Sequence, residues 1–145
     1  MGRVLAEITL INAGDKFRAE CGKITEAELR QKTLTSIVDT GATTLIINAL
    51  IQKELGLKTL YGHTTRMANG DPVTCKVAES VEIHWKDRRM TCEPWVLDGA
   101  PDVLLGVIQL ENMDLTVEPT IEQLVGRHGD EMVSNLYSVN DMFHK

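Results

Sequence analysis

Residues 37 to 43 place a carboxylate at the end of an apolar segment. They read Ile-Val-Asp-Thr-Gly-Ala-Thr, so Asp39 directly follows strand-forming side chains and is itself followed by small ones. An ionised carboxylate at the end of a buried strand costs free energy unless it is paired, hydrogen-bonded or used in a reaction. Asp39 is therefore the first candidate for chemistry, and other segments must indicate which of these three situations applies.

Two further motifs follow Asp39 along the chain. Asn69-Gly70 lies between the extended segments 64–68 and 73–77. An Asn-Gly pair in that setting is the strongest short signal for a β-hairpin, because both residues accept positive φ at little cost. Leu104-Leu105-Gly106 is an apolar pair ended by a glycine, and we expect a short helix over 108–113 after it.

Asp39-Thr40-Gly41-Ala42 resembles the active-site loop of aspartic proteases, specifically those of the retroviral type, the retropepsins. An Asp-Thr-Gly triplet alone is a weak match. Its order with the Asn69-Gly70 hairpin and the Leu104-Leu105-Gly106 motif makes the match specific, and the resemblance covers most of residues 4 to 125. The stretch 103–115 looks most like bacterial members of this clan.

The resemblance implies an aspartic endopeptidase that needs no metal or organic cofactor. In that mechanism two neighbouring carboxylates share one proton, so that one activates water while the other protonates the substrate carbonyl. This sequence has one Asp-Thr-Gly and no Asp-Ser-Gly. The second carboxylate must then come from a second copy, which implies a homodimer with Asp39 beside the twofold axis. The expected partners are that second copy and a polypeptide substrate.

The resemblance also assigns expected roles to neighbouring residues. Thr40 would form a hydrogen bond across the dimer axis, and Gly41 would leave room for the substrate backbone. The Leu104-Leu105-Gly106 motif would pass behind the active-site loop. A flap formed by the hairpin would cover the substrate and exclude water. The expected substrate-binding residues are Ala42, Thr43, Met67, Ala68, Asn69 and Gly70.

The sequence departs from the retroviral pattern in two places. Retroviral members have two acidic residues after the active loop and an arginine after the second glycine, where this chain has Thr43, Thr44 and Val107. Both partners of that ion pair are absent together, so no charge is left unpaired. The chain also continues from 126 to 145, where retroviral chains have ended, so their dimer contacts cannot be transferred to it.

Other interpretations of these motifs remain open. Asp39-Thr40-Gly41 could be an ordinary turn after a strand, since all three residue types favour turns. A phosphoryl-transfer aspartate is disfavoured because no lysine follows at the required spacing and no alternating parallel-sheet pattern is present. The Asn69-Gly70 hairpin could be a mobile flap or plain scaffolding. A catalytically inactive module that dimerises or binds peptides is the alternative to an enzyme.

Composition excludes several other classes of function. The 145 residues carry a net charge of −6 with no basic run, which argues against nucleic-acid binding. No segment approaches the ~20 apolar residues of a membrane span, and no secretory leader is recognisable. The three cysteines form no Cys-x-x-Cys pair and none has metal-ligand spacing with a histidine. We therefore expect free thiols and a cytoplasmic location.

The predicted fold is all-β: a single retropepsin-like acid-protease barrel with one or two short helices. Apolar or β-branched runs predict strands at 4–12, 33–38, 81–85, 89–92, 94–97, 115–117 and 123–125. Asn48 can cap a helix that ends before Gly56, and Thr25 with Glu28 has the spacing of a capping box. We expect residues 1–125 to form the protease domain and residues 126–145 to form a C-terminal extension.

Overall fold

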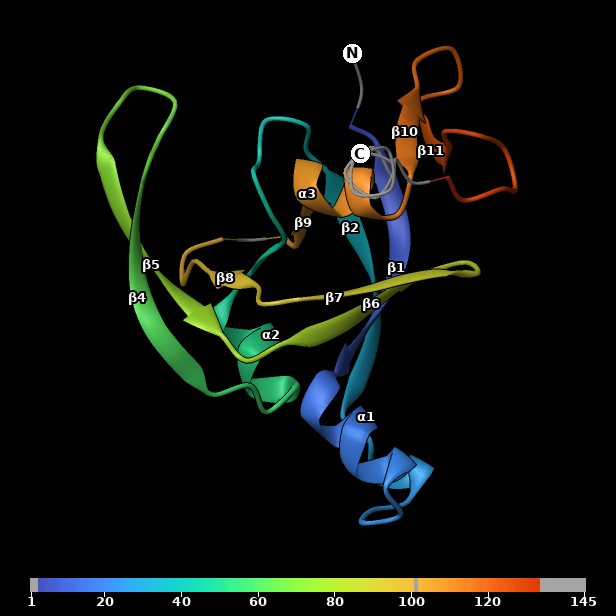
Figure 1. The fold of residues 1–145 in the computed structure, drawn as a ribbon. Coiled ribbons are helices and arrows are strands. Elements are labelled where there is room, and N and C mark those ends of the chain that lie inside the picture. Colours follow the sequence, from blue (N-terminus) through green and yellow to red (C-terminus); the bar gives the residue numbers. More distant parts are fainter. Residues whose placement is uncertain (1–2, 101, 134–145) are drawn as a thin grey trace, which may run out of the picture.

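The computed structural model describes residues 3–100 and 102–133, and every structural statement below concerns these residues. They form a curled nine-stranded sheet, a separate two-stranded sheet and a few short helices (Figure 1). The strands of the large sheet are β1 (Leu5–Asn12), β2 (Gln31–Val38), β3 (Ile46–Ile47), β4 (Thr59–Arg66), β5 (Pro72–Ala78), β6 (Val81–Trp85), β7 (Arg88–Cys92), β8 (Trp95–Val96) and β9 (Leu104–Leu105).

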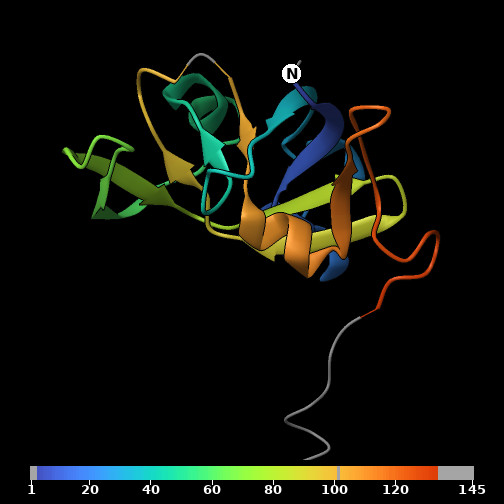
Figure 2. The same ribbon diagram turned by 90° about the horizontal axis from the view of Figure 1, so that it is seen from above.

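The large sheet has the strand order β4-β5-β8-β3-β9-β2-β1-β6-β7. The second sheet pairs β10 (Leu115–Glu118) with β11 (Gln123–Gly126). Figures 1 and 2 show the β4–β5 hairpin and the β10–β11 hairpin at opposite sides of the molecule. The curl of the sheet buries alternate apolar side chains of its strands, among them Ile8, Leu10, Val81 and Ile83, in one core.

Two helices lie close to where the sequence predicts them. In α2 (Ala49–Glu54), the side chain of Asn48 accepts a hydrogen bond from the backbone N–H of Ile51 at 3.0 Å, as expected of an N-cap. The helix α3 (Val107–Asn112) begins directly after Gly106. The capping box of Thr25 and Glu28 forms as well, but it starts a single 3₁₀ turn, Glu26–Glu28.

One helix, α1 (Ala13–Glu20), is absent from the sequence-based prediction. Periodicity does not mark it because its buried residue is a carboxylate, Asp15, while Phe17 on the same helix is exposed. Arg30 binds Asp15 through Nε at 2.8 Å and through its backbone N–H at 3.0 Å, and Arg18 binds it as well. These donors, Arg30 foremost, hold the pKa of Asp15 well below its usual range.

The chain that follows β11 is held against the body of the protein by Arg88. This side chain is buried and donates to the carbonyl oxygens of Asp114 at 2.6 Å and Gly129 at 2.7 Å. The carboxylate of Asp114 accepts from Nδ1 of His128 at 2.6 Å, and this bond lowers the pKa of Asp114. The predicted boundary after residue 125 stays a prediction, and residues 134–145 of the expected extension lie outside the described residues.

Candidate active site

Asp39 stands at the end of β2, where the backbone and one carboxylate oxygen are both hydrogen-bonded. Its backbone N–H donates to the carbonyl oxygen of Leu105 at 3.0 Å. Its Oδ1 accepts the backbone N–H of Gly41 at 2.9 Å, and a Cβ at position 41 would lie 3.2 Å from that oxygen. Asp39 is only half-buried and Thr40 is exposed, so the loop presents the carboxylate and the hydroxyl at the surface of the single chain.

The Leu104-Leu105-Gly106 motif lies between the two strands that flank this loop. Strand β9 pairs in parallel with β2, with Ile37 opposite Leu104, and antiparallel with β3. The loop from 39 to 45 therefore passes around β9. Gly106 is packed directly on Thr44: a Cβ at position 106 would lie 2.6 Å from the backbone N and O atoms of Thr44. Any side chain there would force the loop away from β9.

The first turn of α3 also binds the loop. Backbone N–H groups at the start of a helix have no partner within the helix. Here the N–H of Val107 donates to the carbonyl oxygen of Ala42 at 2.9 Å, and that of Ile108 donates to Thr43 at 3.1 Å. The next residue, Gln109, donates from its side chain to Oγ1 of Thr44 at 2.9 Å. Gln109 is missing from the sequence-based list of site residues.

The predicted flap is a long hairpin whose tip differs in detail from the prediction. The N–H of Met67 donates to the carbonyl oxygen of Asp71 at 2.8 Å, and the N–H of Gly70 donates to Met67 at 2.9 Å. These bonds close a three-residue loop, Ala68 to Gly70. Only Gly70 has positive φ, at 90°, so the expectation that Asn69 shares this conformation is wrong. Three-residue loops of this kind need one such residue, at the bulge that follows a type I turn.

The structure separates the predicted substrate-binding residues into two groups. Ala42 and Thr43 lie in the loop bound by α3, whereas Met67, Ala68, Asn69 and Gly70 form the hairpin tip. Among the described residues, no hydrogen bond joins the tip to the loop that carries Asp39. In Figures 1 and 2 the β4–β5 hairpin projects away from the rest of the sheet. Met67 at its tip is 55% exposed.

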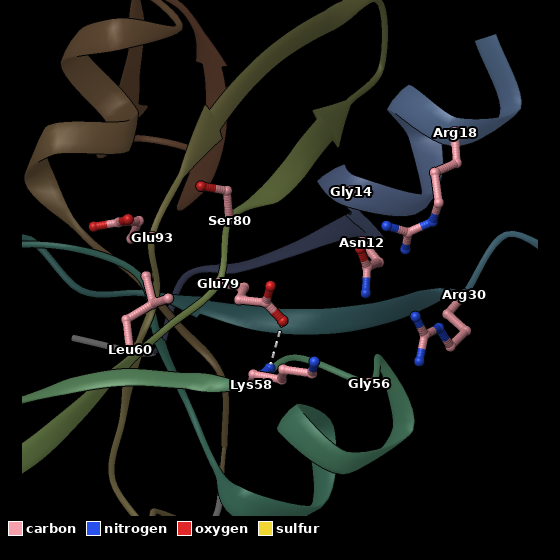
Figure 3. Close-up of a pocket in the computed structure, with 10 residues that line it drawn as sticks. All are labelled: Asn12, Gly14, Arg18, Arg30, Gly56, Lys58, Leu60, Glu79, Ser80 and Glu93. Atoms are coloured by element: carbon pink, nitrogen blue, oxygen red, sulfur yellow. Dashed lines mark hydrogen bonds between the residues drawn. The ribbon is translucent and has the colours of Figure 1, made fainter. Parts of the chain in front are cut away.

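A polar cavity of about 490 Å³ lies away from Asp39, between α1 and the chain that follows α2 (Figure 3). Three of the charged side chains that line it already have a partner. Arg18 and Arg30 bind Asp15, and Glu79 accepts the backbone N–H of Lys58 at 2.7 Å. A smaller groove of about 310 Å³ begins beside the loop that carries Asp39, at Thr40, and continues along α3 to β10.

No group of three or more metal-binding side chains occurs in the described part of the chain, and no helix in that part is long and apolar enough to cross a membrane. All three cysteines, Cys21, Cys75 and Cys92, are free thiols. Burial raises the pKa of Cys92 to about 11, so this thiol is protonated at neutral pH.

Comparison with known proteins gives one family and one fold. A family model for aspartyl proteases matches residues 25–108, a range that contains Asp39, the β4–β5 hairpin and Gly106. Among solved structures, EIAV protease complexed with the inhibitor HBY-793 is similar, with a TM-score of 0.55 and 18% sequence identity. The match covers 77% of this chain and 88% of the viral chain. No curated protein sequence matches.

Proposed function

The chain belongs to the aspartyl protease family and has a retropepsin-like fold, and on that premise we propose that it is an aspartic endopeptidase with Asp39 as its catalytic residue. The predicted mostly-β fold is confirmed. The observation that carries the proposal is the construction of the loop. Asp39 is held through its backbone by Leu105 and through one oxygen by Gly41, while the carboxylate stays accessible.

The proposed reaction uses two copies of Asp39. Two carboxylates that lie close together cannot both be ionised easily, so they hold one proton between them. The ionised one removes a proton from a water molecule, which attacks the peptide carbonyl carbon. The protonated one donates its proton to the carbonyl oxygen, which gives a tetrahedral intermediate. Breakdown of that intermediate with proton transfer to the leaving amine releases the two peptide products.

The homodimer is part of this proposal because one chain supplies only half of the carboxylate pair. Exposure of Thr40 supports it, since a hydroxyl that binds across a twofold axis must be at the surface of the single chain. The groove that begins at Thr40 extends this surface along α3 to β10. In the dimer, two β4–β5 hairpins would cover an extended polypeptide. Three free cysteines fit an enzyme that works in the reducing cytoplasm.

The decisive experiment measures cleavage of an unbiased peptide library across a dilution series of the protein, with Asp39→Asn beside the wild type. We expect cleavage by the wild type only, with a specific activity that falls as the dimer dissociates. Cleavage that survives in Asp39→Asn would remove Asp39 from the mechanism. A dimer that binds peptides without cleaving them would instead favour the catalytically inactive binding module.

A further inference from the structure

The active-site loop depends on a side-chain contact that the family resemblance does not predict. Three successive residues of α3 bind three successive residues of the loop: Val107 and Ile108 through their backbone N–H groups, and Gln109 through its side-chain amide. The first two bonds come with any helix that starts at this place. The third depends on the identity of the side chains at 109 and 44.

Gln109 and Thr44 form a buried, uncharged pair. Gln109 is completely buried and Thr44 is 6% exposed, and Nε2 of Gln109 donates to Oγ1 of Thr44 at 2.9 Å. The other amide atom of Gln109, Oε1, has no hydrogen-bond partner among the described residues, and the amide also lies beside the Cys92 thiol, where it opposes the rise in the thiol pKa that burial causes. Burying an amide oxygen without a hydrogen-bond partner costs free energy. Such an amide contributes less to stability than an apolar side chain of the same shape. Its presence is better explained by what it holds in place.

The pair fixes the far end of the loop that carries Asp39. At the near end, the N–H of Asp39 is bound by Leu105. At the far end, the backbone of Thr44 rests on Gly106 and its hydroxyl accepts from Gln109. The loop is thereby tied at both ends to one continuous segment, residues 105 to 109. Thr43 and Thr44 in the loop and Val107 in that segment are neutral, where the retroviral members that the chain resembles have charged residues.

We propose that Gln109 is a positioning residue for Asp39, acting through its hydrogen bond to the Thr44 hydroxyl. The inference rests on the proposed peptidase function. An active-site carboxylate must stand within a fraction of an ångström of its productive place, and small displacements lower the rate strongly. Loss of the Gln109–Thr44 bond frees the far end of the loop while it leaves Asp39, Thr40 and Gly41 intact.

The test compares Gln109→Met and Thr44→Val, each of which keeps the shape and removes one partner of the bond, on the library peptide that the wild type cleaves fastest. We expect each to lower kcat roughly tenfold with KM changed by less than about twofold. The double variant should be no slower than the slower single variant, because one bond is lost in all three. Thr44→Ser keeps the hydroxyl and should retain a kcat close to that of the wild type.

A control exists on α2, where Nε2 of Gln52 donates to Oγ1 of Thr59 at 2.9 Å and to the carbonyl oxygen of Leu57 at 3.0 Å, both nearer the surface than the Gln109–Thr44 bond. Gln52→Met removes these two side-chain bonds outside the loop and should leave kcat unchanged. Unaltered kcat per folded dimer in Thr44→Val, or multiplicative losses in the double variant, would overturn the proposal. Thr44→Val and Thr44→Ser decide the matter if Gln109→Met does not fold.

Hydrogen exchange gives a readout that does not depend on activity. The amides of Gly41 and Ala42 donate within the loop, to Oδ1 and to the carbonyl oxygen of Asp39. They should exchange at least about fivefold faster in Thr44→Val and Gln109→Met than in Gln52→Met. Equal exchange in all three overturns the positioning role. An inactive wild type with faster exchange in the first two variants would refute the peptidase proposal and leave the coupling of Gln109 to the loop standing.

Discussion

The loop that carries Asp39 and the tip of the β4–β5 hairpin are both short connections, yet they are stabilised in opposite ways. The loop binds residues far away in the sequence, including Leu105 and Gly106. The hairpin tip binds only itself: its hydrogen bonds join Met67, Asn69, Gly70 and Asp71 to one another and to Arg66. Every residue of β4 is also at least partly exposed.

This difference indicates that the hairpin tip can move more easily than the loop that carries Asp39. A segment whose bonds are local and exposed opens at little cost, whereas a segment tied to several distant elements opens only when those elements separate. Chemistry that depends on the position of a carboxylate suits the second kind, and a cover that must admit and release a polypeptide suits the first. Four substitutions test this contrast, from the largest expected effect to the smallest.

The largest difference in peptide cleavage should appear when an aspartate is replaced by asparagine in each of the two regions. Asp39→Asn keeps the size of the side chain and an oxygen that can accept the N–H of Gly41, but it abolishes the shared proton. We expect peptide cleavage to fall by about a thousandfold or more. Asp71→Asn in the hairpin tip should leave cleavage within a small factor of the wild type. Comparable losses in both variants, measured on one peptide, would contradict the contrast.

The second largest effect concerns stability. In Gly106→Ala the new methyl group meets the backbone of Thr44 at 2.6 Å, so the loop or β9 must shift. We expect the free energy of unfolding to fall by about 3 kcal/mol, measured by urea denaturation. Gly99→Ala is the control, because a Cβ at position 99 meets nothing within 4 Å. If Gly106→Ala is as stable as Gly99→Ala, the loop can shift away from β9 at little cost in free energy.

At the hairpin tip, turnover should change more than stability. Gly70 has a φ of 90°, and valine there strains the turn by about 1–2 kcal/mol. Because the tip would cover the substrate, we expect kcat to fall roughly tenfold in Gly70→Val. Gly22→Val carries a comparable strain, at a φ of 74°, in the turn after α1, and it should leave kcat unchanged. If Gly70→Val melts earlier but its folded fraction cleaves normally, the hairpin is scaffolding.

The smallest effect tests whether the two regions are independent. Asn69→Ala removes the side-chain oxygen that accepts the N–H of Asp71 at 3.0 Å. The bond is exposed, so we expect a loss of about 0.5–1 kcal/mol that is confined to the tip. Hydrogen exchange should speed up at the amide of Asp71 and stay constant at that of Ala42. A change at both amides would show that the tip and the loop are coupled within one chain.

Most strands and two of the helices could be predicted because their signals are local. Asn48 caps α2 through a bond to a residue three positions later, and the strand alternation appears directly in the sequence. The α1 helix escaped prediction since its buried side chain, Asp15, needs Arg30 from a distant segment as its partner. Gln109 was not predicted for the same reason. It comes close to its partner, Thr44, only because β9 lies between β2 and β3 in the folded sheet.

The parallel pairing of β2 with β9 also sets an order of events during synthesis. Ile37 must find Leu104, so Asp39 leaves the ribosome long before the segment that shapes its loop has been made. Pairings across such a separation in the chain form late and slowly. A nascent chain therefore carries the Asp39 carboxylate in a loop that does not yet have its final shape. If the chain is a peptidase, this topology would delay proteolytic activity until translation has passed α3.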